Sequence, residues 1–177
     1  MIKKEDFKVI KSDIVYDHYL KIRRDIIKSP NGKIVDYNYV DSFDAVLLLP
    51  ILDNHIIMLR QYRYPLRKII YDLPAGGVSF GETTEETAEK ELKEETGYIT
   101  NSLQFVHSFY HAPGTMASIV HTFVAKDLEK GKQNLEETEF CEVVYVSISK
   151  FEELITDNIV EATIPAAYFI AKEKQLI

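Results

Sequence analysis

The sequence predicts an α+β fold in which helices pack on a mixed β-sheet. The chain has 177 residues, of which 46% are apolar and 28% are charged, a composition typical of a globular domain with its own core. Apolar runs of strand length are mixed with helical stretches, and the two do not alternate regularly. Because regular βαβ alternation produces a parallel sheet, its absence favours a mixed sheet with helices packed on it.

The first part of the chain, residues 7–40, is expected to form short antiparallel strands. Two apolar pairs, 26–27 and 34–35, flank a Ser-Pro-Asn-Gly stretch at 29–32. Asn-Gly between apolar segments is a strong signal for a β-hairpin. We therefore predict an N-terminal antiparallel β region.

The rest of the chain supplies the main sheet and its helices. The apolar run 45–49, a turn at 53–54 and the run 55–59 predict a buried hairpin. Further strands are expected over residues 103–110, 118–126 and 142–147. Helices are expected over residues 83–96, 149–155 and 163–173, with Ser149 as the cap of the second.

The first of these helices has clear end signals. Thr83 or Thr84 can cap its N-terminus, with Glu86 or Thr87 three residues later, and Gly97 can end it. The residues between them are rich in Glu, Lys and Ala, which favour helices. These signals predict a helix from residue 83 to residue 96.

Three glutamates gather on one face of this helix. Glu91, Glu94 and Glu95 are three and four residues apart, and such positions share a helical face. Two bare carboxylates about 6 Å apart repel by roughly 3 kcal/mol, so a cluster of this kind either lies on a solvated face or holds a cation. A Gly-rich turn before the helix offers a backbone carbonyl as well. Oxygen ligands of this type suit Mg²⁺ or Mn²⁺, ions that neutralise phosphates and activate water.

Composition argues against several other classes of function. A net charge of −7 disfavours a general nucleic-acid binder. The longest apolar stretch, 45–52, is far shorter than the ~20 residues that span a bilayer, so we expect a cytoplasmic protein without a membrane partner. Cys141 is the single cysteine, which excludes an internal disulfide. His107, His111 and His121 are expected to be partly buried, to be hydrogen-bonded or to line the pocket, rather than to bind zinc.

Residues 76–98 resemble the Nudix box, G-x5-E-x7-R-E-U-x-E-E-x-G-U, where U is aliphatic. The positions in register are Gly76, Glu82, Glu91, Leu92, Glu94, Glu95 and Gly97. Lys90 stands where the pattern has Arg, and Tyr98 stands where it has an aliphatic residue. The resemblance implies the α/β/α Nudix sandwich and metal-dependent hydrolysis of a diphosphate.

Segments outside the box resemble the ADP-ribose pyrophosphatase-like branch of the Nudix hydrolases. Residues 60–65 (RQYRYP) and 72–77 (DLPAGG) match two of its segments, although Asp72 replaces the usual Glu. The proline-glycine turn at 112–114 and the stretch 139–171 match others. The resemblance implies two parts, an N-terminal β region (residues 1–42) that helps to form a homodimer and a Nudix hydrolase domain (residues 43–177).

The resemblance also assigns metal ligands and a candidate general base. Glu91 and Glu95 match the main metal ligands, and Glu94 matches a further ligand or a catalytic helper. The carbonyl of Ala75 matches a backbone ligand. A glutamate in the loop after the long strand is the candidate base; Glu139 and Glu137 are both eligible, and register slightly favours Glu139.

The substrate-binding residues follow from the same resemblance. Arg63 matches an arginine that contacts the diphosphate, and Asp72, Pro113 and Gly114 lie in matching segments. The chain has no Trp, so adenine stacking would fall to an aromatic side chain such as Phe43, Tyr37 or Tyr39, for which packing in the core or in a dimer is the alternative.

The function expected from these assignments is Mg²⁺-dependent hydrolysis of a nucleoside diphosphate sugar, with Mn²⁺ as the second candidate metal. ADP-ribose is the preferred substrate and would give AMP and ribose 5-phosphate. One alternative is the same chemistry on another nucleotide sugar such as GDP-mannose. A second alternative is a non-hydrolytic Nudix module that senses nucleotides, which the complete set of carboxylates disfavours.

Overall fold

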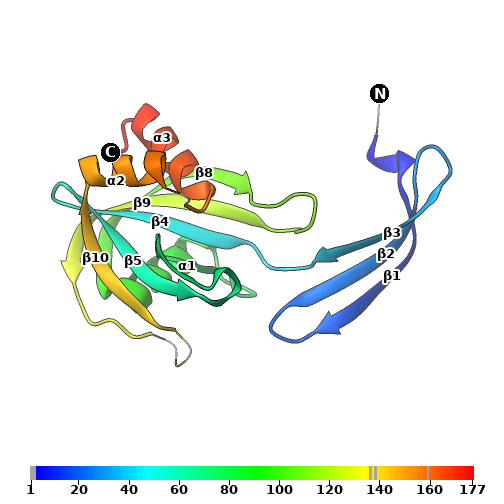
Figure 1. Cartoon of the computed structure of the whole chain (residues 1–177), viewed down its shortest axis with the longest axis horizontal. Helices are drawn as coiled ribbons and strands as arrows, with labels where there is room; N and C mark the ends of the chain where they lie inside the picture. The colour runs from blue at the N-terminus through cyan, green and yellow to red at the C-terminus, as the bar shows by residue number, and fades with distance from the viewer. Residues whose placement is uncertain (1–2, 136, 138, 159) are drawn as a thin grey trace. The chain divides into compact units, whose positions relative to one another are not determined.

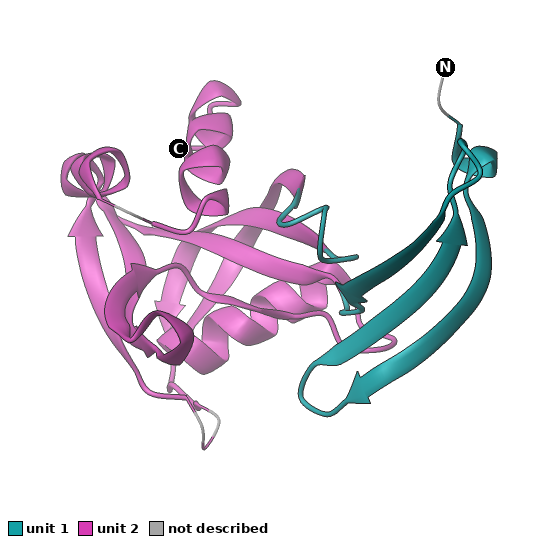
Figure 2. Cartoon of the chain, turned by 45° about the vertical axis from the view of Figure 1, so that its right-hand side comes forward, with its two compact units in different colours: residues 1–43, 110–118 teal, residues 44–109, 119–177 magenta. Residues whose placement is uncertain are grey.

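The computed structural model describes residues 3–135, 137, 139–158 and 160–177 (Figure 1). Two compact units are distinguished, coloured separately in Figure 2. The first comprises residues 1–43 and 110–118, and the second comprises residues 44–109 and 119–177.

The first unit is built on an antiparallel sheet of three strands in sequence order. These are β1 (Lys8–Asp17), β2 (Lys21–Lys28) and β3 (Ile34–Val40), preceded by the 3₁₀ turn η1 (Lys4–Asp6). The predicted turn between β2 and β3 is confirmed, because the N–H of Gly32 donates to the carbonyl of Ser29 at 2.9 Å. Gly32 has a φ of +83°, which a glycine adopts without strain.

The second unit contains a mixed sheet, as the sequence predicts. Its strands are β4 (Ala45–Leu52), β5 (His55–Arg63), β6 (Lys68–Asp72), β7 (Ala75–Gly77), β8 (Tyr98–Tyr110), β9 (Ile119–Lys130) and β10 (Cys141–Ser147). The main order is β10-β5-β4-β9-β8, with β6 beside β5 and β7 beside β4. β4 runs parallel to β9 and antiparallel to β5 and β7. The 3₁₀ turn η2 (Tyr64–Leu66) connects β5 to β6.

Helices cover both faces of this sheet (Figure 1). Leu47 and Leu49 of β4 pack in the core cluster that includes residues of α2 (Ile148–Asp157) and α3 (Thr163–Glu173). The alternate residues Val46 and Leu48 pack in the cluster that includes residues of α1 (Thr84–Glu91). Burying a side chain of this size contributes about 1.5–3 kcal/mol, so β4 anchors all three layers. The predicted α/β/α sandwich is confirmed.

The helical segment formed by α1 and the turn η3 (Leu92–Thr96) begins at the predicted cap and ends at the predicted glycine. The N–H of Glu86 donates to the hydroxyl of Thr83 at 3.2 Å, and the N–H of Thr83 donates to the Glu86 carboxylate at 2.9 Å. This reciprocal pair is a capping box. Gly97 closes the segment in the left-handed conformation, with a φ of +76°.

The end of this helix differs from the regular α-helix expected over residues 83–96. Residues Leu92–Thr96 form a π-helical turn, η3, in which backbone hydrogen bonds span five residues. The hydroxyl of Thr96 donates to the carbonyl of Leu92 at 2.5 Å inside this turn. Wide turns of this type occur frequently at functional sites.

Two other boundaries also differ from the expected ones. β8 begins at Tyr98, because Gly97 turns the chain directly from the helix into the strand. The cap of α2 is Ser147, whose hydroxyl accepts from the N–H of Lys150 at 3.4 Å, so the assignment of Ser149 as the cap was wrong. In the described part of the chain, no helix has the length and apolar character needed to cross a bilayer.

Candidate active site

Gly76 brings the turn before α1 into contact with the helix. β7 pairs with β4 so that Gly76 lies opposite Val46, on the face of the sheet that α1 covers. A Cβ atom on Gly76 would lie 2.2 Å from the carboxyl carbon of Glu91. Only glycine therefore leaves room for the Glu91 carboxylate to rest against this turn, which explains why the pattern requires glycine here.

Glu95 is a buried carboxylate at the centre of the site. Glu95 is only 7% exposed, and its carboxylate accepts a hydrogen bond from the N–H of Ala75 at 2.8 Å. Burial raises its pKa to about 8; the hydrogen bond from Ala75 opposes this shift, and the charges of Glu91 and Glu139 add to it. Such a group is stable in the interior when it carries a proton or faces a cation.

Of the two candidate bases, Glu139 is the one with an electrostatic connection to Glu95. Glu139 is half-buried and raises the pKa of Glu95, whereas Glu137 is exposed. Burial raises the pKa of the nearby Cys141 thiol to about 11, and the charges of Glu95 and Glu139 contribute to that shift. The carboxylates of Glu95 and Glu139 therefore face a common region beside the start of β10.

Arg63 is held near these carboxylates by Asp72. Its Nη2 and Nε atoms lie 2.5 and 3.2 Å from the same Asp72 oxygen, which also accepts from Gln61 at 3.1 Å. The second Asp72 oxygen accepts from the N–H of Leu73 at 3.0 Å. Arg63 in turn lowers the pKa of Glu95, so its positive charge acts within the site. The structure thus shows Asp72 as a support for Arg63, and direct contact of Asp72 with substrate stays a prediction.

Lys90, which replaces the arginine of the pattern, lies between two carboxylates of the box. Its ammonium nitrogen is 4.0 Å from a Glu82 oxygen and 3.7 Å from a Glu91 oxygen. The other Glu82 oxygen accepts from the Thr87 hydroxyl at 3.1 Å. A lysine can approach both carboxylates but lacks the planar fork with which arginine binds two oxygens at once.

The donor set fits a divalent cation. Carboxylate oxygens of Glu91, Glu94 and Glu95 and the carbonyl of Ala75 are the hard ligands that Mg²⁺ prefers, and Glu95 is a buried carboxylate that a cation would stabilise. Among the described residues, no three acidic, His or Cys side chains converge closely enough to enclose a metal. The structure therefore does not bring the three glutamates together as an enclosed metal site, and their binding of a cation stays a prediction.

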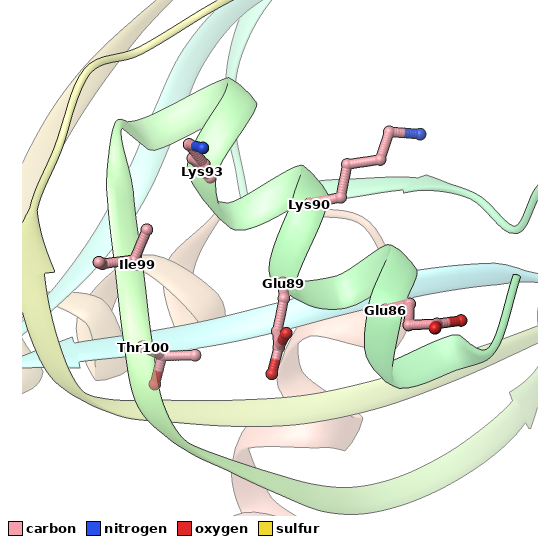
Figure 3. A pocket seen from close by; sticks show the side chains of 6 residues that line it. All are labelled: Glu86, Glu89, Lys90, Lys93, Ile99 and Thr100. Atoms are coloured by element: carbon pink, nitrogen blue, oxygen red, sulfur yellow. The ribbon is translucent and has the colours of Figure 1, made fainter.

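The outer face of α1 carries a separate, shallow hollow of about 310 Å³ (Figure 3). Its lining residues are Glu86, Glu89, Lys90, Lys93, Ile99 and Thr100. Glu91 and Glu95 are not among them. The predicted metal ligands therefore do not form this hollow, although Lys90, which lines it, lies 3.7 Å from a Glu91 oxygen.

Asp44 is a supporting residue that sequence reasoning missed. Its carbonyl accepts from the N–H of Val78 at 2.8 Å, and its carboxylate accepts from the N–H of Ile119 at 2.8 Å. The other carboxylate oxygen lies 3.4 Å from Nε2 of His121, whose Nδ1 is 2.9 Å from the Ser108 hydroxyl. Asp44 thereby ties the segment after β7 to β9. The expectation that the histidines are hydrogen-bonded is confirmed for His121.

Three of the predicted substrate-binding residues belong to the first unit. Phe43 is 66% exposed, and the carbonyl of Gly114 accepts from the hydroxyl of Tyr37 at 2.7 Å. Pro113 lies in the same turn as Gly114. Their contact with substrate stays a prediction.

Replacing Gly76 by alanine should weaken divalent-cation binding while the fold persists. The added Cβ would displace the Glu91 carboxylate, which is the end of a flexible side chain, so the clash would move a predicted metal ligand rather than the backbone. We expect the Mn²⁺ dissociation constant of Gly76→Ala, measured by titration calorimetry, to rise at least tenfold. Gly77→Ala is the matched control, since a Cβ there meets no atom within 4 Å. Equal affinities in the two variants would contradict this role of Gly76.

The raised pKa of Glu95 predicts how the stability of the metal-free protein depends on pH. A carboxyl with a pKa of about 8 in the folded state, against 4.5 when unfolded, favours folding most below pH 4.5. This contribution is lost as the pH rises towards 8, at about 1.4 kcal/mol for each unit of pKa difference. Urea denaturation in EDTA at pH 5 and pH 8 measures it. Glu95→Gln should show a smaller loss, and an unchanged pH dependence would argue against a buried, perturbed Glu95.

Comparison with known proteins identifies the family of the chain. Residues 41–167 match the NUDIX domain. The chain is 36% identical over 154 residues to the ADP-ribose pyrophosphatase of Bacillus subtilis (strain 168), covering 85% of this chain and 83% of that protein. It is 35% identical over 156 residues to the methanol dehydrogenase activator of Bacillus methanolicus, covering 85% and 84%.

The fold comparison agrees with the sequence comparison. A crystal structure of an ADP compounds hydrolase superimposes with a TM-score of 0.84 at 26% identity, covering 94% of this chain and 92% of that one. The domain match spans the box, Arg63 and Glu139 alike. The chain belongs to the Nudix hydrolase family.

Proposed function

We propose that the chain hydrolyses the pyrophosphate bond of nucleoside diphosphate sugars, with ADP-ribose as the preferred substrate and AMP and ribose 5-phosphate as products. The observation that carries the proposal is the buried Glu95 carboxylate, grouped with Glu91 and Glu139 and faced by Arg63. Relatives named ADP-ribose pyrophosphatase in Bacillus subtilis and Mycobacterium tuberculosis support the choice of substrate.

The proposed cofactor is Mg²⁺, with Mn²⁺ as a possible substitute. Nudix hydrolases generally depend on divalent cations. Glu91, Glu94, Glu95 and the Ala75 carbonyl are the proposed ligands. The cation, when bound, supplies positive charge that neutralises the diphosphate and lowers the pKa of water.

The protein's own residues then bind the diphosphate and remove a proton. Arg63, fixed in place by Asp72, offsets phosphate charge. Glu139 takes the proton of the attacking water as the oxygen of that water bonds to one phosphorus atom. The bond between that phosphorus and the bridging oxygen breaks, and the second phosphate leaves with the bridging oxygen. Each product is a phosphomonoester.

We also propose that the N-terminal β region, residues 1–42, joins two copies of the chain. Large apolar side chains of this sheet and of the segments beside its strands are exposed, namely Phe7, Val9, Ile10, Ile14, Val15, Tyr16, Tyr19, Leu20, Ile34, Val35 and Tyr37. Extensive exposed apolar surface marks a site of protein–protein interaction. A second copy, whose sheet carries the same surface, is the proposed partner. Phe43, Pro113 and Gly114, which belong to the same unit, are the proposed substrate contacts outside the carboxylate cluster.

Two alternatives keep the same fold. The enzyme would act on another nucleotide sugar, such as GDP-mannose, if the base and sugar are recognised differently. It would be a non-hydrolytic sensor if the carboxylates bind a cation without turnover. The similarity to a protein named methanol dehydrogenase activator is nearly as high as that to an ADP-ribose pyrophosphatase, so the substrate has to be tested directly.

The purified protein with Mg²⁺ should release AMP and ribose 5-phosphate from ADP-ribose, which ³¹P NMR or chromatography of the nucleotides detects. Glu95→Gln should lower kcat by at least 10²-fold, because the amide cannot supply the anionic oxygen that a hard cation needs. Glu129→Gln is the control, since Glu129 is an exposed glutamate near the C-terminal end of β9 whose carboxylate accepts from the side-chain amide of Asn101.

Three outcomes would count against the proposal. Faster turnover of GDP-mannose at matched concentration would support the alternative substrate. Thermal stabilisation by Mg²⁺ without turnover of any diphosphate would support the sensor. Equal activity of wild type and Glu95→Gln would show that the Glu95 carboxylate is not needed for hydrolysis.

The dimer is tested by placing charge on the exposed apolar surface. Val9→Lys combined with Ile34→Lys introduces two ammonium groups at side chains that are 62% and 60% exposed in the single chain. The wild type should sediment as a dimer in analytical ultracentrifugation, and the double variant should sediment as a monomer with unchanged circular dichroism. Lys8→Ala is the control in the same strand. A monomeric wild type would refute the proposal.

A further inference from the structure

The segment that follows β9 is fastened to the end of the carboxylate helix. The Gln133 side-chain amide donates to the carbonyl of Glu95 at 2.6 Å, and the N–H of Asn134 donates to the carbonyl of Glu94 at 2.9 Å. The N–H of Gly131 donates to the carbonyl of Gly97 at 2.6 Å. The last carbonyls of a helix lack hydrogen-bond donors within the helix. Here the segment 131–134 supplies donors for the carbonyls of Glu94 and Glu95 and for that of Gly97, which follows the turn.

The close approach of this segment depends on Gly97. A Cβ atom at Gly97 would lie 2.8 Å from the backbone nitrogen of Gln133 and 3.3 Å from its Cα. The clash would be with backbone, which cannot move aside as the end of a side chain does. Gly97 therefore has a second role besides ending the helix, because it lets the segment 131–134 lie directly on the turn that carries Glu94 and Glu95.

The same segment leads to Glu139, six residues after Gln133. Beyond Glu139 the chain enters β10, where Cys141 pairs with Gln61 of β5. Described contacts therefore lie on both sides of Glu139: Gln133 donates to the carbonyl of Glu95, and β10 pairs with β5, the strand that carries Arg63. The Gln133 bond is the one contact of the three that a side chain makes, so it can be removed without changing the backbone.

We infer that Gln133 is a positioning residue that holds the Glu139 loop at a fixed distance from the carboxylate helix. By binding the carbonyl of Glu95, its amide ties the start of the loop to the residue that is the proposed metal ligand. The inference rests on the proposed function, in which Glu139 takes a proton from water. A proton transfer of this kind requires hydrogen-bond distance, so a loop displaced by 1 Å would slow it strongly.

A purely structural role for Gln133 predicts different behaviour. If the amide only caps the helix end, its loss would lower the melting temperature but leave kcat of the folded enzyme unchanged. If it positions Glu139, its loss lowers kcat while KM and metal affinity hold, because the carboxylate ligands and Arg63 keep their own supports in Ala75, Gly76 and Asp72.

Gln133→Met is the direct test, since methionine is similar in length, uncharged and unable to donate a hydrogen bond. We expect kcat for ADP-ribose to fall at least tenfold, with KM and the Mn²⁺ dissociation constant within twofold of wild type. Gln104→Met is the matched control, an exposed glutamine on β8 for which the described residues provide no hydrogen-bond partner. Gln133→Lys, which keeps a donor of comparable reach, should recover part of the loss.

Hydrogen exchange gives a readout that does not depend on activity. The amide protons of Gly131 and Asn134 donate to the helix end, so NMR should show both exchanging at least tenfold faster in Gln133→Met than in wild type. Equal exchange rates would overturn the tether, and faster exchange with unchanged kcat would overturn the positioning role. A wild-type protein that hydrolyses no diphosphate would refute the proposed function and with it the positioning of a base, whereas the exchange rates would still decide whether Gln133 holds the loop.

Discussion

The constraint on which the site depends is the burial of the Glu95 carboxylate beside Glu91 and Glu139. Removing a carboxylate from water and placing like charges near it both oppose ionisation, and together they raise its pKa to about 8. The protein compensates only in part, through the N–H of Ala75 and the charge of Arg63. A cation would supply the remaining compensation. The burial of Glu95 therefore favours a bound cation at the place where we propose that the diphosphate binds.

The surrounding elements keep these charges together despite their repulsion. β7 pairs with β4, whose central residues are buried, and this pairing fixes Ala75 and Gly76 against the helix. Asp44 ties the next residues of the turn to β9, and the capping box starts α1 directly after the turn. The π-helical turn and the segment 131–134 close the other end. Each of these contacts includes at least one backbone group, although the long side chains of Glu86 and Gln133 lose rotamer entropy when they are ordered.

Local features could be predicted from the sequence, and contacts between distant residues could not. Thr83, Glu86 and Gly97 carry their own signals, because capping depends on residues three or four positions apart. The box spacing likewise anticipated the carboxylate cluster. The hydrogen bond from Gln133 to Glu95 joins residues 38 positions apart, and those of Asp44 with Ile119 and His121 join residues 75 and 77 positions apart. A pattern of neighbouring residues cannot predict contacts of this kind. The π-helical turn was missed because glutamate and lysine fit a regular helix equally well.

The positions of the basic side chains explain how an acidic segment can receive a phosphate. Seven Glu and two Lys lie between residues 76 and 98, which accounts for −5 of the net charge of −7. Asp72 binds Arg63 and Glu82 lies beside Lys90, and neither carboxylate is a proposed metal ligand. Asp72 and Glu82 thus pair with cationic side chains, whereas the proposed metal ligands form a second group of carboxylates. Glu91 belongs to this second group but also lies 3.7 Å from Lys90. A divalent cation bound to the proposed metal ligands would neutralise their negative charge. The positive charges of Arg63 and Lys90 would then no longer be exceeded by nearby carboxylates. An anionic diphosphate then meets an attractive surface on a helix whose bare sequence would repel it.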